Sequence, residues 1–323
     1  MTRIDSEIYI DGSILGEIKH LKLAFPKQSM TVISVLKLGE SSGIACADER
    51  ESHGGRQYDV AKKIYRLTDY AFTGFSGNVW LANEVVASMS SRLKGDMPLA
   101  DLSKLAEEAY REARDRKFRS VELAKYGVSW EEFKNGRVDA EIKAKLAAAA
   151  ADDKSFPINF VLIGIDPATK QFTGRYLDYP GYAVPFGNYL CIGSGSDRAE
   201  LLIGDKLHSM KPEERANINL AKGCRIVMEA TQSAWRNFGV GGRSQVVWIN
   251  NGEQTELDYR ASNILNNLVF CSQRGVVSTD FVDDMFKQIV ENKGTPADAM
   301  KEVEGKIDKD AMLRLFFEES LHL

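Results

Sequence analysis

The stretch QSMTVISVLKLGESSGIACADER, residues 28–50, decides the fold. It contains two short apolar runs, and a segment rich in Gly and Ser separates them. Runs of this kind, bounded by turn residues, predict a β-hairpin with strands at 31–38 and 43–48. Thr31 stands at the mouth of the first run, and the second run ends in an acid and a base. The question is whether Thr31 is an ordinary strand residue or a working N-terminus.

Outward from this hairpin, strand and helix signals alternate in blocks. A turn at Thr68-Asp69 divides the segment 62–77 into two short strands, and apolar residues recur at helical spacing from 78 to 93. Ser129 stands three residues before Glu132, a capping-box pattern that starts a helix. The other predicted strands are 158–166, 171–179, 189–195 and 242–250. The other predicted helices are 99–125, a helix ending near 151, 197–207 and 213–236, and the segment 278–322 is predicted to be helical with breaks near 294–296 and at 307–308.

This order of elements favours an α+β fold. Strands that come in separate groups predict antiparallel sheets packed as a sandwich and flanked by helices, rather than a doubly wound parallel sheet. No long linker or repeat divides the chain. We therefore predict a leader at 1–30, a core at 31–252 with a helical insertion at about 112–155, and a C-terminal helical extension at 253–323.

Composition excludes several classes of protein. Hydrophobic residues make up 44% and charged residues 27% of the chain, a balance typical of soluble globular proteins. A net charge of -4 gives no broad attraction to nucleic acid or anionic lipid. No apolar run approaches the roughly 20 residues of a membrane span, and the acidic N-terminus does not resemble a signal peptide, so we predict a cytoplasmic protein.

Cysteine and histidine give no sign of a metal site. The four cysteines are far apart and form no CxxC pair, so we predict free, buried thiols. The four histidines are scattered as well, and neither a zinc site nor a Ser-His-Asp triad has support in the sequence. We predict no cofactor.

Thr31 gains a chemical role only as an N-terminal residue. Inside a chain its hydroxyl is a weak nucleophile, whereas at an N-terminus the free α-amine lies within reach of the hydroxyl and acts as its base. A nearby ammonium lowers the pKa of that amine, and a carboxylate holds the ammonium in place. Lys63 and Asp48 are candidates for this pair, and the backbone N–H of Gly77, in GFSGN, is a candidate oxyanion donor.

Several separated motifs, in one order, resemble the proteasome β-subunit family of N-terminal-nucleophile (Ntn) threonine peptidases. TVISV followed by GIACADER is similar to the first two strands of that family, and KKIY follows at the family's spacing. FSGN before a helix, CIGSGS before another helix, and VGGRSQVVWI resemble three later family motifs. The matches span roughly residues 31–250.

The resemblance implies the Ntn-hydrolase fold, a four-layer αββα sandwich, and a set of roles. It implies Thr31 as nucleophile, Lys63 as the catalytic lysine with Asp48 orienting it, Gly77 as oxyanion donor and Ser194 as proton relay. The substrate would be a peptide or protein. Members of the family close into rings, so a homo-oligomer is also implied.

The sequence departs from the family at the turn before the last core strand. Asn237 stands in place of an acid and Val240 in place of a serine. The register is open as well, because either Met30 or Thr31 aligns with the nucleophile, and the Thr31 alignment needs a bulge to keep the strand faces. Autocatalytic removal of the leader, or initiation at Met30 with loss of the Met, would each expose Thr31.

Other readings stay open. The chain is alternatively a degenerate, non-catalytic assembly subunit or an amidase for small molecules. Thr31 is then a plain strand residue, Asp48 and Lys63 a structural ion pair, or Lys63 an exposed side chain. Ser194 could serve as a helix N-cap, and Gly77 could be required only for positive φ.

Overall fold

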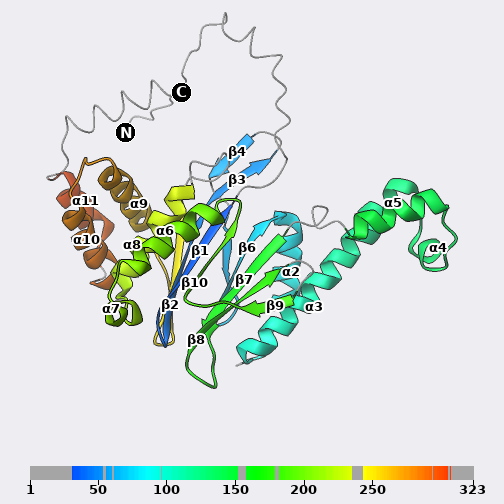
Figure 1. Ribbon diagram of the computed structural model, residues 1–323, viewed down its shortest axis with the longest axis horizontal. Coiled ribbons are helices and arrows are strands. Elements are labelled where there is room, and N and C mark those ends of the chain that lie inside the picture. The colour runs from blue at the N-terminus through cyan, green and yellow to red at the C-terminus, as the bar shows by residue number, and fades with distance from the viewer. Residues whose placement is uncertain are drawn as a thin grey trace, which may run out of the picture.

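The computed structural model describes residues 31–53, 56–59, 62–95, 97–151, 158–178, 182–234, 243–292, 294–304 and 306. The predicted leader at 1–30, the departures Asn237 and Val240, and most of 305–323 lie outside these residues. In the described part, two five-stranded antiparallel sheets pack face to face and helices cover their outer faces (Figure 1). The predicted α+β sandwich of antiparallel sheets is confirmed at this level.

Each sheet is antiparallel throughout. In spatial order the first sheet consists of β10 (Tyr189–Gly193), β1 (Val32–Gly39), β2 (Ser42–Asp48), β11 (Ser244–Asn250) and β12 (Glu253–Glu256). The second sheet consists of β5 (Ile64–Arg66), β6 (Ala71–Gly77), β7 (Ile158–Ile165), β8 (Phe172–Asp178) and β9 (Tyr182–Pro185). A separate ribbon pairs β3 (Arg50–His53) with β4 (Arg56–Asp59).

The opening hairpin forms as predicted and lies at the centre of the first sheet. Successive side chains of a strand point to opposite faces. In β1, Val32 and Leu36 pack against the outer helices, whereas Ile33 and Val35 pack between the two sheets. Because both faces are buried, most residues of the strand are apolar, with Ser34 and Lys37 as the polar exceptions. The β1–β2 register shifts between Lys37 and Gly39.

Helices cover the two sheets from opposite sides. The second sheet carries α2 (Val79–Arg92) and α3 (Leu99–Lys117). The helical side of the first sheet is made up of α6 (Ser196–His208), α7 (Pro212–Ala216), α8 (Leu220–Ser233), α9 (Tyr259–Gln273), α10 (Thr279–Phe286), the π-helical turn η5 (Lys287–Glu291) and α11 (Pro296–Glu304). Among the described residues, no helix has the length and apolar character needed to cross a bilayer.

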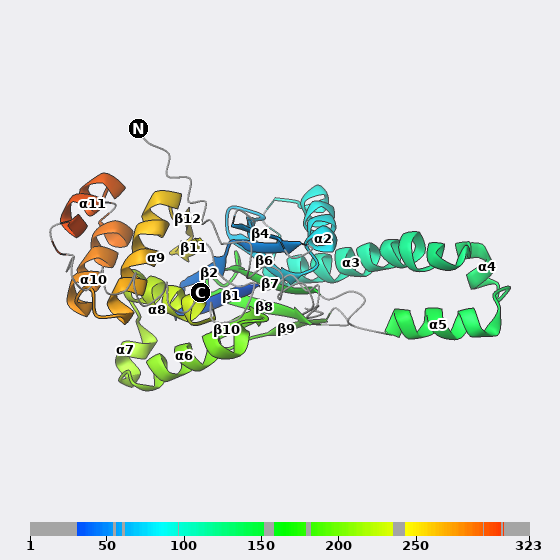
Figure 2. The same ribbon diagram turned by 90° about the horizontal axis from the view of Figure 1, so that it is seen from above.

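The predicted insertion forms a helical arm. Figure 2 shows α3 running out of the body and α5 (Ala140–Ala151) returning beside it. Between them lie the short elements η1 (Phe118–Glu122), η2 (Ala124–Tyr126) and α4 (Trp130–Lys134). The predicted capping box is confirmed, because the Ser129 hydroxyl accepts a hydrogen bond from the Glu132 amide and the Glu132 carboxylate accepts one from the Ser129 amide.

Two predictions about element boundaries are wrong. The helix predicted at 213–236 is two helices, α7 and α8, because the Asn219 side chain accepts a hydrogen bond from Lys222 N and starts α8 afresh. The region beyond 252 is not purely helical, since its first residues form β12. Asn251 and Gly252 have φ values of 50° and 87°, as expected for an Asn-Gly hairpin turn.

Candidate functional site

Thr31 lies directly before β1 and meets the turn that follows β10. Its side chain is buried, with 2% exposure. Its backbone N–H donates a hydrogen bond to Ser194 Oγ at 3.3 Å, and its carbonyl accepts one from Gly195 N at 3.4 Å. Because β10 is the neighbour of β1, with Gly193 opposite Val32, a distant segment of the chain reaches the mouth of β1.

The glycines around Ser194 are required by this close approach. Gly193 has φ of 100°, and a Cβ there would lie 2.0 Å from the Thr31 carbonyl oxygen. A Cβ on Gly195 would lie 2.5 Å from the Cβ of Ala234. Gly195, not Ser194, is the N-cap residue of α6, so the reading of Ser194 as a helix cap is wrong. The Ser194 hydroxyl accepts from Thr31 instead.

Asp48 and Lys63 form a buried ion pair beside Thr31. The Lys63 Nζ to Asp48 Oδ1 distance is 3.0 Å, and the side chains are 2% and 0% exposed. Lys63 Nζ also donates to the Arg50 carbonyl at 2.6 Å, and Asp48 Oδ1 accepts from Val32 N at 2.8 Å. The reading of Lys63 as an exposed side chain is therefore wrong. The hydrogen bonds offset part of the desolvation cost of burying two charges.

Gly77 ends β6 on the opposing sheet. Its φ is 105°, so the requirement for positive φ is confirmed. The next residue, Asn78, accepts a hydrogen bond from Leu81 N and caps α2. The preceding residue, Ser76, lies close to the turn after β10, because its Cβ is 3.3 Å from the position that a Cβ on Gly193 would take. The chain at Gly77 thus passes close to the turn that carries Ser194.

The five predicted residues lie at, or directly beside, the ends of five different strands at one end of the two sheets. Direct contacts join Thr31 to Ser194, and join Asp48 to Lys63. The Val32 amide, one residue from Thr31, connects the two pairs through Asp48. By strand alternation, the Thr31 side chain lies on the same face of β1 as Ile33, which is the face toward the second sheet and Lys63.

Burial sets the protonation behaviour around this cluster. It raises the pKa of the half-buried Glu49 carboxyl above its ordinary value, against the opposing effect of the Arg243 guanidinium. Burial also raises the pKa of the Cys46 thiol to about 12, which leaves it protonated and unreactive at neutral pH. The prediction of free, buried cysteines is confirmed for all four.

Sequence reasoning missed one residue of the site. Gln245, in β11, hydrogen-bonds to the backbone of Lys63 and Ile64 with its side-chain amide. The only local signal is a polar residue inside the apolar run SQVVWI. Within the described residues, no group of three or more His, Cys, Asp or Glu side chains could hold a metal ion.

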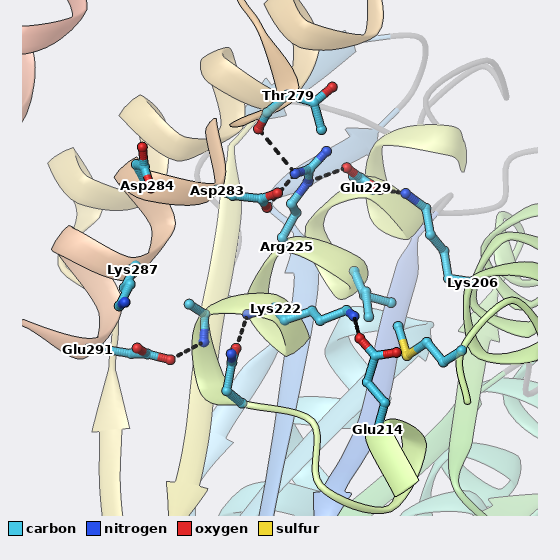
Figure 3. A pocket seen from close by; sticks show the side chains of 14 residues that line it. Lys206, Glu214, Lys222, Arg225, Glu229, Thr279, Asp283, Asp284, Lys287 and Glu291 are labelled. Atoms are coloured by element: carbon cyan, nitrogen blue, oxygen red, sulfur yellow. Dashed lines mark hydrogen bonds and ion pairs between the residues drawn. The ribbon is translucent and has the colours of Figure 1, made fainter. Parts of the chain in front are cut away.

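A cavity of about 560 Å³ lies elsewhere, between α6, α8 and α10 (Figure 3). Its charged side chains largely neutralise one another. Glu229 pairs with Lys206 and with Arg225, and Arg225 also pairs with Asp283. None of the predicted site residues lines it. A second cavity, of about 920 Å³, lies at the opposite end of the first sheet and is lined by the β1–β2 turn at Ser41.

The functional assignment of this protein depends on the geometry of the site. No protein-family model matches the chain. No curated protein matches it either.

Proposed function

We propose that this protein is a proteasome-like Ntn hydrolase that cleaves peptide bonds through Thr31. The observation that carries the proposal is the position of the Thr31 nitrogen. It lies 3.3 Å from a hydroxyl, at the mouth of a strand, beside a lysine that is 98% buried and paired with an acid. Such an arrangement is what an N-terminal threonine requires for its amine to act as a base.

The proposed chemistry follows from these contacts. Once the peptide bond to Met30 is gone, the Thr31 α-amine takes the proton of its own hydroxyl, and Oγ1 attacks the substrate carbonyl. The Lys63 ammonium keeps the amine's pKa low enough for it to be neutral, and Asp48 holds Lys63. The Gly77 N–H stabilises the oxyanion, and Ser194 relays the proton to the leaving amine. Water then hydrolyses the ester on Thr31.

The fold and the register add support. An Ntn-hydrolase fold consists of two antiparallel sheets between helical layers, and the arrangement here has that form. Aligning Thr31, rather than Met30, with the nucleophile requires a bulge in the first hairpin. The β1–β2 register shifts between Lys37 and Gly39, so this hairpin does contain an irregularity. We therefore favour Thr31.

The resemblance also leads us to propose a homo-oligomer of ring-like form. The edge strand β9 exposes Tyr182 and Val184, which a neighbouring subunit would cover. One observation favours a non-catalytic assembly subunit instead. Lys63 Nζ already has two protein partners, Asp48 Oδ1 and the Arg50 carbonyl, as a purely structural ion pair would.

Intact mass and N-terminal sequencing of the purified protein separate these functions. The hydrolase requires a chain that begins at Thr31, whereas a chain that keeps residues 1–30 supports the assembly subunit. We expect Thr31→Ala to abolish the hydrolysis of fluorogenic peptides and any autocatalytic cut before residue 31, and Thr31→Ser to keep both. Thr73→Ala is the matched control, since Thr73 is equally buried, at 1% exposure, but lies within β6. Peptidase activity that survives Thr31→Ala would refute the mechanism, and cleavage of simple acyl amides alone would indicate a small-molecule amidase.

A further inference from the structure

Gln245 joins the two sheets at the candidate site. It is the second residue of β11 and pairs with Ala47, which directly precedes Asp48 in β2. Its side chain is buried, with 5% exposure. From this position in the first sheet it reaches the backbone of Lys63 and Ile64 in the second sheet.

All four hydrogen-bonding positions of the Gln245 amide are used. Its Oε1 accepts from Lys63 N at 3.1 Å and from Ile64 N at 2.9 Å. Its Nε2 donates to the Ile64 carbonyl at 2.8 Å and to Glu256 Oε1 at 2.8 Å. A side-chain amide has two donor hydrogens and two acceptor lone pairs, so the group is saturated. Two N–H donors on one side and two acceptors on the other fix its orientation.

Lys63 needs such an anchor because of its place in the second sheet. It directly precedes β5, which is an edge strand of three residues. Its carbonyl accepts from Phe75 N at 3.1 Å, which ties one side of the residue to β6. Gln245 ties the other side, and Glu256 adds an ion pair to the neighbouring Lys62 at 3.0 Å.

We propose that Gln245 is a positioning residue for Lys63. By fixing the Lys63 backbone against the strand next to Asp48, it aims the Lys63 ammonium at Asp48 Oδ1 and at the Thr31 nitrogen. The inference deepens the proposed function, on which its catalytic consequence rests. Without this anchor the Lys63 backbone would be free to tilt. Because the lysine side chain is long and flexible, a small tilt of the backbone would displace Nζ from its position beside Asp48.

The test must separate the loss of the Gln245 hydrogen bonds from any change in the charges near Lys63. Asp48 and Glu49 lie at the end of β2, and Arg243 precedes β11. Glu256 lies on β12 and pairs with Lys62. A neutral, isosteric replacement of Gln245 leaves all these charges unchanged. The test variant is therefore Gln245→Met.

The matched control is Gln232→Met. Gln232 is 6% exposed, and its Nε2 donates to the carbonyl and to Oδ1 of Asn266, on the helical side of the first sheet. Both variants lose buried amide hydrogen bonds and both should unfold more easily. Gln245→Asn is a second variant for the case that Gln245→Met does not fold, because it keeps a polar group but is too short to make all four bonds.

The first readout is independent of any hydrolysis. The Cε and Nζ NMR signals of Lys63, assigned by their loss in Lys63→Met, report its pairing with Asp48. We expect Gln245→Met, or Gln245→Asn, to move these signals toward their positions in Asp48→Asn, and Gln232→Met to leave them in place. Signals that stay in place in the folded Gln245 variants would overturn the proposal, whether or not the protein is active.

The second readout is the pH profile of peptide hydrolysis. If the Lys63 ammonium is held less precisely near the Thr31 amine, the pKa of that amine rises. The acid limb of the pH–rate profile should then move to higher pH by about one unit. We expect kcat to fall about tenfold and KM to stay unchanged. Gln232→Met should keep the wild-type profile. An active Gln245→Met enzyme with an unchanged profile would overturn the positioning role. Absence of cleavage in the wild type would refute the proposed function and leave the NMR result to decide the placement of Lys63.

Discussion

The backbone nitrogen of Thr31 lies 3.3 Å from the hydroxyl of Ser194, although 163 positions separate the two residues in sequence. The contact exists because β10 pairs with β1 and a glycine turn brings Ser194 back over the mouth of that strand. The same nitrogen would be the α-amine of an N-terminal threonine. The variants below test what surrounds it.

Ser194→Ala removes the acceptor of the Thr31 N–H. Ser194 is exposed and does not cap α6, so we expect the fold to remain stable. The rate of peptide hydrolysis should fall about tenfold to hundredfold, because one proton-transfer partner is lost. Steady-state kinetics measure this, with Ser209→Ala, an exposed serine at the end of the same helix, as control. An unchanged kcat would exclude Ser194 from the reaction.

Breaking the buried pair should cost more stability than removing it. Lys63→Met leaves the fully buried Asp48 carboxylate without its cation, so we expect the free energy of unfolding to fall by about 3–5 kcal/mol. In the double variant with Asp48→Asn, the amide oxygen can still accept from Val32 N, and the loss should be smaller. Urea unfolding of the single and double variants gives the coupling energy. Additive losses would mean that the two side chains do not interact.

Gly193→Ala should disrupt the site, whereas Gly252→Ala should not. Both residues have positive φ, 100° and 87°, so both pay the strain of an L-residue, about 1 kcal/mol. Only at Gly193 would the new Cβ clash with backbone, 2.0 Å from the Thr31 carbonyl oxygen, while at Gly252 nothing lies within 4 Å. We expect thermal unfolding to show a much larger loss for Gly193→Ala. Equal losses would place the Thr31 carbonyl elsewhere.

The raised pKa of Glu49 predicts a pH-dependent stability. Burial is the main cause of the shift, and it favours the protonated form. The folded-state pKa of Glu49 is above its unfolded-state pKa. The free energy of unfolding therefore falls as the pH rises from the unfolded-state pKa through the folded-state pKa. Glu49→Gln removes that loss, so the variant should gain stability relative to wild type at about pH 7 compared with about pH 4. Urea titrations of the variant and the wild type at the two pH values measure this difference.

Local patterns predicted most of the fold correctly. The opening hairpin, the helix α2 and the capping box at Ser129 depend on residues close in sequence, and they form where expected. The split between α7 and α8 was missed, because the Asn219 cap that starts α8 was not recognised in the sequence. The Asn251-Gly252 turn carried a local signal for β12 that the helical reading of the extension overlooked.

The candidate site was predicted only through the family resemblance. No spacing rule connects Asp48 to Lys63 or Thr31 to Ser194, since their contacts depend on the pairing of strands and the packing of sheets. Gln245 was missed for the same reason. Three of its four hydrogen bonds go to backbone atoms 181 and 182 positions away, and backbone groups are the same for every residue type, so the sequence does not mark them.

The burial of Thr31, at 2% exposure, has a kinetic consequence for autocatalytic removal of the leader, one of the two routes that would expose it. A second protein molecule has little access to a bond beside so enclosed a residue, so the reaction would be unimolecular. Its half-time would then be the same in a dilute and in a concentrated preparation.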